Sequence, residues 1–156
     1  MARAFVFPGQ GSQAVGMAQD LLSAFPIARE TLEEVDDALS QNLTRLIAEG
    51  PADKLTLTEN AQPALMAVSM AVMRVLEKEA NIDISGACAF VAGHSLGEYS
   101  ALAAARAFGL ADAARLLRTR GQAMQKAVPV GEGGMAALLG AELDQAQEIA
   151  DAAADG

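Results

Sequence analysis

The sequence predicts an α/β fold, a parallel sheet flanked by helices on both faces. Two short apolar runs, residues 4–7 and 87–92, each end at a glycine-containing turn, which is typical of buried strands. Longer segments with apolar residues at helical spacing follow each run, and this order favours parallel strands joined by helices. Hydrophobic residues make up 52% of the chain but aromatic residues only 4%, so small aliphatic side chains must form most of the core.

Helical spacing and proline positions place the other elements. Residues 17–46 are expected to form two helices separated at Pro26, because proline interrupts a helix interior. Pro63 suits the first turn of a further helix that runs to Glu79. That helix is apolar on nearly all sides, so we expect it at the centre of the fold. The remaining predicted helices are residues 95–105, 110–127 and 143–154.

A glycine cluster at residues 131–134 predicts a boundary between two units, residues 1–130 and residues 131–156. The second unit begins with a predicted strand at residues 135–139 and one helix. A single strand and helix cannot cover both of their faces. We therefore expect the second unit to be truncated.

Composition excludes several classes of function. The net charge of −9 and the pI near 4.5 argue against nucleic-acid binding, which needs a basic face. The single Cys88 excludes an internal disulfide and predicts a reducing, cytoplasmic location. No apolar run is long enough for a membrane span, PGQG at residues 8–11 interrupts any signal peptide, and no metal-ligand cluster is present.

One stretch is basic within this acidic chain. Residues 101–130 carry five cationic side chains against one acid, Asp112, for a local charge of +4. The stretch is either a solvated helix face or a surface that attracts an acidic partner. The cations are Arg106, Arg115, Arg118, Arg120 and Lys126.

Residues 93–97 (GHSLG) match the G-x-S-x-G pattern between a predicted strand and a predicted helix. This sharp turn exposes the serine hydroxyl, and its glycines avoid collisions with neighbouring backbone. Ser95 is therefore the candidate nucleophile, with the Leu96 amide as the first oxyanion donor. The single histidine, His94, adjoins Ser95 on the turn and projects in another direction, so we expect it to pack rather than to act as the base.

Four motifs extend this pattern along the chain. In the same order and at similar spacing, they resemble conserved segments of the malonyl/acyl transferase family. They are FPGQGSQ at residues 7–13, TENAQPAL at 58–65, GHSLGEYSAL at 93–102 and TRGQAMQ at 119–125.

The resemblance implies a role for each matching residue. Ser95 would form an acyl-enzyme ester, and Gln10 would supply the second oxyanion amide beside Leu96. Arg120 would bind the free carboxylate of a malonyl group, a task that suits its planar guanidinium. Gln62 would help to line the pocket. If the resemblance is set aside, the sequence favours the interpretation of Arg120 as a surface cation on a basic helix.

The implied reaction moves a malonyl group from malonyl-CoA to the phosphopantetheine thiol of acyl carrier protein in fatty-acid synthesis, without a cofactor. The implied fold is an α/β-hydrolase-like large subdomain followed by the first βα unit of a ferredoxin-like small subdomain. The catalytic histidine and the residue that orients it would come from the missing C-terminal half of the same enzyme. That half would be a further partner of this chain.

Other functions remain open at this point. The chain could belong to an ordinary serine hydrolase or thioesterase of the α/β-hydrolase type, or to an acyltransferase for another acyl group. It could also be a non-catalytic interaction module that keeps the motif without its base. Polyketide synthesis is the alternative pathway.

Overall fold

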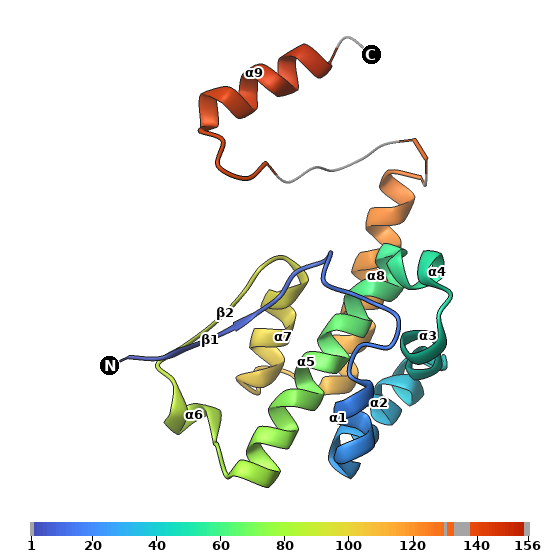
Figure 1. Cartoon of the computed structure of the whole chain (residues 1–156), viewed down its shortest axis with the longest axis vertical. Coiled ribbons are helices and arrows are strands. Elements are labelled where there is room, and N and C mark those ends of the chain that lie inside the picture. The colour runs from blue at the N-terminus through green and yellow to red at the C-terminus, as the bar shows by residue number, and fades with distance from the viewer. Residues whose placement is uncertain (1, 130, 133–137, 155–156) are drawn as a thin grey trace.

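The computed structural model describes residues 2–129, 131–132 and 138–154. Their elements run in the order shown in Figure 1. These are β1 (Ala4–Phe7), α1 (Gln19–Ala24), α2 (Pro26–Leu39), α3 (Leu43–Glu49), α4 (Ala52–Thr56), α5 (Thr58–Ala80), α6 (Ile84–Ala87), β2 (Phe90–Gly93), α7 (Leu96–Ala104), α8 (Leu110–Ala127) and α9 (Leu143–Ala153).

The two strands pair in parallel, with Ala4 opposite Phe90 and Phe7 opposite Gly93. The first strand has the predicted bounds. The second begins three residues later than predicted, because residues 84–87 form the short helix α6, whose last amides bond to Asp83 O. Since the strands are parallel, the loops after Phe7 and Gly93 lie at the same edge of the sheet.

The described helices cover one face of this sheet. Helix α7 packs on both strands, α5 packs on α7, and α8 and α2 pack on α5 (Figure 1). Val6 is 73% exposed and Phe90 is 67% exposed. The prediction of helices on both faces is therefore not met by the part of the chain that the structure describes.

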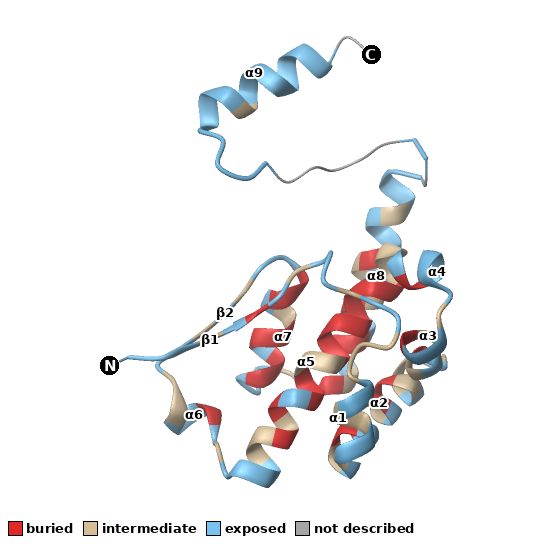
Figure 2. Ribbon diagram, viewed as in Figure 1, coloured by how far each residue is buried: buried red, intermediate tan, exposed pale blue. Residues whose placement is uncertain are grey.

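Helix α5 is the centre of the fold, as predicted, and most buried residues in Figure 2 lie on it and on the helices that contact it. It begins at Thr58 rather than at Pro63, which lies inside the helix as its sixth residue. Residue 63 lies beyond the first four amides that a helix leaves unpaired, so the proline removes the helical hydrogen bond that Glu59 O would otherwise accept.

Residues 17–46 form three helices instead of two. The break at Pro26 is confirmed, and a second break occurs where Ser40 takes a positive φ of 50°. The side chain of Asn42 then accepts a hydrogen bond from the Arg45 amide at 2.8 Å and starts α3. Serine and asparagine end and cap helices readily, and this local signal explains the extra break.

The second unit is only partly described. The predicted strand at residues 135–139 lies outside the described residues except for Leu138 and Leu139, which are not in a strand, and the glycine cluster also falls largely outside them. The predicted last helix is present as α9, which begins with a capping box between Glu142 and Gln145 and has no buried residue (Figure 2).

Helices α5 and α8 approach each other closely at Gly121. A Cβ added there would lie 2.6 Å from Glu59 Cα and 2.7 Å from Thr58 O, both backbone atoms that cannot move aside easily. Only glycine therefore fits at this crossing without shifting a helix.

We expect Gly121→Ala to lower the free energy of unfolding by about 1–3 kcal/mol, because overpacking forces the backbones apart. Denaturant unfolding of the chain measures the effect. The matched control is Gly86→Ala in α6, where an added Cβ meets no atom within 4 Å. Equal stability of the two variants would contradict the proposed close contact.

Candidate active site

Ser95 lies on a strained turn between β2 and α7. Its backbone has φ 56° and ψ −111°, a conformation that residues other than glycine seldom adopt. The turn is closed by Gly97 N, which donates to His94 O at 2.9 Å, and by Glu98 N, which donates to Ser95 O at 3.1 Å. The predicted strand–turn–helix is therefore present, with an exposed serine at its tip.

The two glycines that flank Ser95 are required by close backbone contacts. A Cβ on Gly93 would lie 1.9 Å from Gly97 C, inside the first turn of α7. A Cβ on Gly97 would lie 2.5 Å from Phe7 O at the end of β1. These glycines let the helix, the turn and both strands meet at one point.

Leu96 and Gln10 lie on the two loops at this edge of the sheet. Leu96 is the first residue of α7, so its amide belongs to the helix terminus that carries unpaired N–H groups and partial positive charge. Its side chain is fully buried and anchors the helix start. Gln10 follows β1, and its side chain donates to Thr58 Oγ1 at 3.4 Å.

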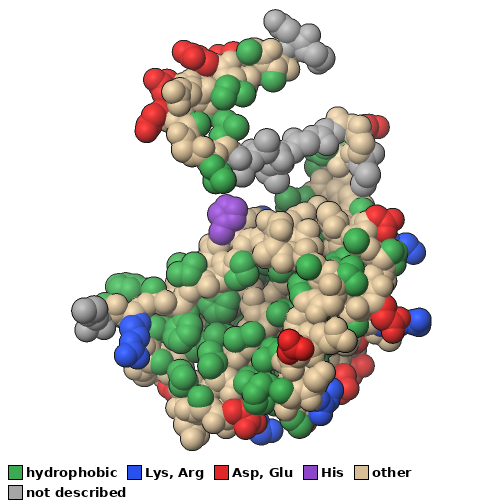
Figure 3. Space-filling view, viewed as in Figure 1, with side chains coloured by type: hydrophobic (Ala, Val, Ile, Leu, Met, Phe, Trp, Pro, Cys, Tyr) green, Lys and Arg blue, Asp and Glu red, His purple; other side chains and the backbone are tan. Residues whose placement is uncertain are grey.

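His94 packs against the loop that carries Gln10. A Cβ on Gly9 would lie 2.4 Å from His94 Nδ1 and 3.0 Å from His94 O. The His94 amide also donates to Phe7 O at 3.3 Å, which continues the strand pairing into the turn. The imidazole is exposed and appears in purple at the surface in Figure 3. This geometry fits the predicted packing role.

Arg120 brings three predicted residues together. Its Nη2 donates to Ser95 Oγ at 3.0 Å, and its Nη1 donates to Gln62 Oε1 at 2.7 Å. Gln62 is 0% exposed, and its Nε2 donates to Met124 Sδ at 3.3 Å, so its carbonyl oxygen points at the arginine. The guanidinium also lies 5.9 Å from the centre of the Tyr99 ring.

This arrangement sets one positive charge beside an exposed hydroxyl nucleophile. A guanidinium fork binds a carboxylate through two parallel hydrogen bonds. Arg120 can therefore hold a negatively charged group next to Ser95 while the helix terminus at Leu96 faces developing negative charge. Together these features suit acyl transfer from a substrate that carries a free carboxylate.

Sequence reasoning missed Thr58, Tyr99 and Met124 as neighbours of the site. Each lies four residues from a predicted site residue, namely Gln62, Ser95 and Arg120 respectively. Residues four apart on a helix share a face, so helical spacing could have identified Thr58 and Met124.

The cations of the basic stretch at residues 101–130 have different local partners. Arg106 pairs with Glu77 at 3.2 Å and Asp83 at 3.5 Å, and Arg115 pairs with Asp112 at 3.1 Å. Arg118 and Arg120 bind side-chain oxygens inside the fold. Four of the five cations are thus held by local partners, and attraction for an acidic partner stays a prediction for this stretch. The visible basic and acidic side chains are interspersed in Figure 3.

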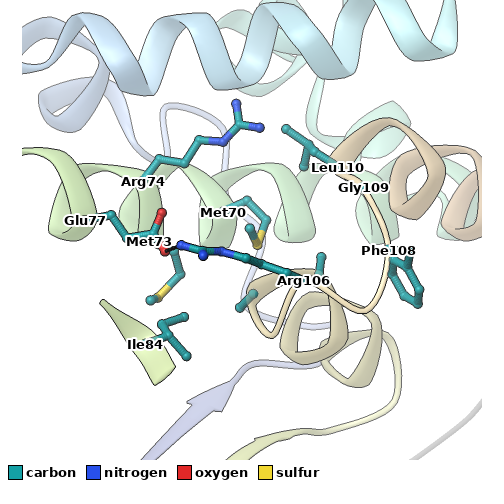
Figure 4. Close-up of a pocket in the computed structure, with 11 residues that line it drawn as sticks. Met70, Met73, Arg74, Glu77, Ile84, Arg106, Phe108, Gly109 and Leu110 are labelled. Atoms are coloured by element: carbon teal, nitrogen blue, oxygen red, sulfur yellow. Dashed lines mark hydrogen bonds and ion pairs between the residues drawn. The ribbon is translucent and has the colours of Figure 1, made fainter. Parts of the chain in front are cut away.

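A separate cavity of about 310 Å³ lies between α5, α6 and α7 (Figure 4). Met70, Met73 and Ile84 supply apolar walls. Both arginines that line the cavity already bind carboxylates. Arg106 pairs with Glu77, and Arg74 pairs at 2.7 Å with Glu34, which does not line the cavity. None of the five predicted site residues lines it.

Within the described residues, no cluster of three or more histidine, cysteine or acidic side chains could hold a metal ion. The helices described here are also too short or too polar to cross a membrane.

Comparison with known proteins places the chain in a class. A family model described as the acyl transferase domain matches residues 4–154. The chain therefore belongs to the acyl transferase family.

The names of individual relatives specify a narrower group within this family. The chain is 49% identical over 148 residues to the malonyl CoA-acyl carrier protein transacylase of Bacillus subtilis strain 168, covering 95% of this chain and 45% of that protein. The acyl-carrier-protein-S-malonyltransferase of Bartonella henselae is 60% identical with a TM-score of 0.91, covering 99% of this chain and 49% of that one. The chain thus spans about half the length of these proteins.

A third similar structure contains a partner. It is a type II PKS acyl-carrier protein in complex with its malonyl-transacylase, at 45% identity and a TM-score of 0.77. The match covers 83% of this chain and 40% of that chain.

Proposed function

We propose that this chain carries the nucleophile and the carboxylate anchor of a malonyl-CoA:acyl carrier protein transacylase. The observation that carries the proposal is the position of Arg120, which donates to both Ser95 Oγ and the buried Gln62. An anchor beside the nucleophile suits an acyl group with a free carboxylate. The names of the relatives support the same substrate and the same acceptor.

In the proposed first half-reaction, Ser95 Oγ attacks the malonyl thioester carbon. The Oγ–C bond forms, the C–S bond breaks, and the thiol of CoA leaves with the serine proton. The amides of Leu96 and Gln10 hold the oxyanion, and Arg120 with Gln62 holds the distal carboxylate. In the second half-reaction, the phosphopantetheine thiol of acyl carrier protein attacks the ester and frees Ser95. Malonyl-CoA is a substrate, and the proposed reaction uses no cofactor.

The general base for Ser95 is proposed to come from a second half of the family fold. His94 is the single histidine of the chain, and its ring lies against Gly9. Serine needs a base within hydrogen-bond reach. We call this chain together with a separately produced C-terminal half of the family fold the reconstituted enzyme.

The subdomain assignment belongs to the same proposal. Residues 1–130 would be the N-terminal part of an α/β-hydrolase-like subdomain, supported by the parallel strands and the turn at Ser95. Residues 131–156 would begin a ferredoxin-like small subdomain. The absence of buried residues on α9 supports a need for further chain to cover it. The single free Cys88 supports the cytoplasm as the proposed location.

Two other functions are less well supported. A serine hydrolase or thioesterase has no need of a cationic anchor fixed by a buried glutamine. A non-catalytic interaction module has no need to keep Ser95 on a strained turn. The PKS complex among the similar structures keeps polyketide synthesis open as a pathway.

Intact-mass spectrometry after addition of malonyl-CoA, with peptide mapping, tests the nucleophile. We expect the reconstituted enzyme to gain one malonyl group on Ser95, and the chain alone to gain none because it lacks the base. Ser95→Ala is the control and should stay unlabelled. Labelling at another residue, or none in a folded reconstituted enzyme, would refute the proposal.

Substitution of Arg120 tests the anchor. We expect Arg120→Ala to lower kcat/KM for malonyl-CoA about 10- to 100-fold, because a charged hydrogen-bonded pair contributes about 1.5–3 kcal/mol. Acetyl-CoA, which lacks the carboxylate, should be affected far less. Arg115→Ala, an exposed arginine on the same helix, is the matched control. An equal loss with both substrates would argue against a carboxylate anchor.

A further inference from the structure

A second arginine of α8, Arg118, joins four segments of the fold through neutral groups. Its Nη1 donates to Asn60 Oδ1 at 2.8 Å, and its Nη2 donates to Gln41 Oε1. Gln41 Nε2 donates to the same Asn60 oxygen at 3.2 Å, and Asn60 Nδ2 donates to Lys54 O at 2.8 Å. This amide cluster, Gln41–Asn60–Arg118, links the α2–α3 loop, α4, α5 and α8.

The cluster holds a partly buried cation without a carboxylate in hydrogen-bond contact among its described partners. Burial lowers the pKa of the Arg118 guanidinium, and the negative charge of Glu59 offsets part of that shift. A guanidinium nevertheless stays protonated at neutral pH. Its donors therefore remain directed at Asn60 and Gln41, and Asn60 is only 7% exposed.

The first turn of α5 needs support from outside the helix. Pro63 has no amide hydrogen, so the carbonyl of Glu59 four residues earlier receives no helical hydrogen bond. The residue before the helix, Leu57, provides no side-chain cap. This same turn carries Thr58, which binds Gln10, and Gln62, which binds Arg120.

The two arginines hold that turn from two sides. Residues two apart on a helix point about 200° apart. This applies to Arg118 and Arg120 on α8 and also to their partners Asn60 and Gln62 on α5. Gly121 makes the close contact with Thr58 and Glu59 at the same crossing. Loss of either arginine removes the hydrogen bond from α8 to one side of this turn.

We propose that Arg118 is a positioning residue that fixes the first turn of α5 and thereby the Gln62–Arg120 anchor beside Ser95. The proposal rests on the proposed function, since it assigns Arg118 an effect on carboxylate recognition. Without Arg118, Asn60 keeps its bonds to Gln41 and Lys54 O but loses its link to α8, and Gln62 then holds Arg120 less firmly in line with the nucleophile. Small displacements of this kind reduce rates strongly.

The test compares malonyl-CoA and acetyl-CoA as substrates of the reconstituted enzyme. Arg118→Met keeps an unbranched apolar stem and removes the guanidinium donors. We expect it to raise KM for malonyl-CoA about tenfold and to lower the preference for malonyl-CoA over acetyl-CoA by about the same factor. Turnover of acetyl-CoA should stay within about twofold. Arg118→Lys, which keeps the charge but not the fork, should lie between wild type and Arg118→Met.

The matched control is Arg115→Met, which removes an exposed arginine of α8 paired with Asp112. It should leave the preference unchanged. In an Arg120→Ala background, Arg118→Met should cause no further loss of preference, because Arg118 acts through Arg120.

Equal losses with both substrates, or an unchanged preference, would overturn the proposal and leave Arg118 with a purely structural role. If Arg118→Met does not fold, the preference of Arg118→Lys decides in the same way. Failure of the proposed function gives a different result, because Arg120→Ala itself would then leave the preference unchanged.

Discussion

The site depends on the close backbone packing around Ser95. The first turn of α7 lies against the ends of both strands, and no side chain fits at Gly93 or Gly97. Because these backbones meet, Ser95 is held at a positive φ with its hydroxyl outside the fold. The same contact brings the loop after β1 to the start of α7, so both proposed oxyanion amides share one edge of the sheet.

A second constraint acts on the helices behind this turn. Gly121 lets α8 approach α5, and Arg118 and Arg120 then bind Asn60 and Gln62 on different sides of the first turn of α5. The proposed nucleophile and the proposed carboxylate anchor thus come from two packed helix layers. Close backbone contacts position both layers. We therefore expect the proposed chemistry at Ser95 to be sensitive to groups that never touch the substrate.

The sequence predicted the features that local chemistry determines. The strand before Ser95, the glycines of the turn and the break at Pro26 all follow from the conformational limits of a few neighbouring residues. Short helices such as α4 and α6 were missed because they are too short to show a helical period. The family resemblance named Arg120 and Gln62, but composition and spacing could not have joined residues 58 positions apart.

The local partners of the basic stretch could not be predicted for a related physical reason. A sum of charges along the sequence groups Arg106 with the cations near it in the chain. In the fold, Arg106 lies beside Glu77 and Asp83, which come from an earlier segment. The start of α5 was predicted too late because Pro63 was placed in the first turn, whereas it is the sixth residue of the helix.

The most direct test of an acyl transferase function is a single-turnover transfer experiment. The reconstituted enzyme is loaded with labelled malonyl-CoA, freed of excess substrate, and mixed with acyl carrier protein that carries phosphopantetheine. Transfer of the label from Ser95 to the carrier thiol is the expected result. Release of the label as free malonate, with the carrier unlabelled, would contradict it and identify a hydrolase.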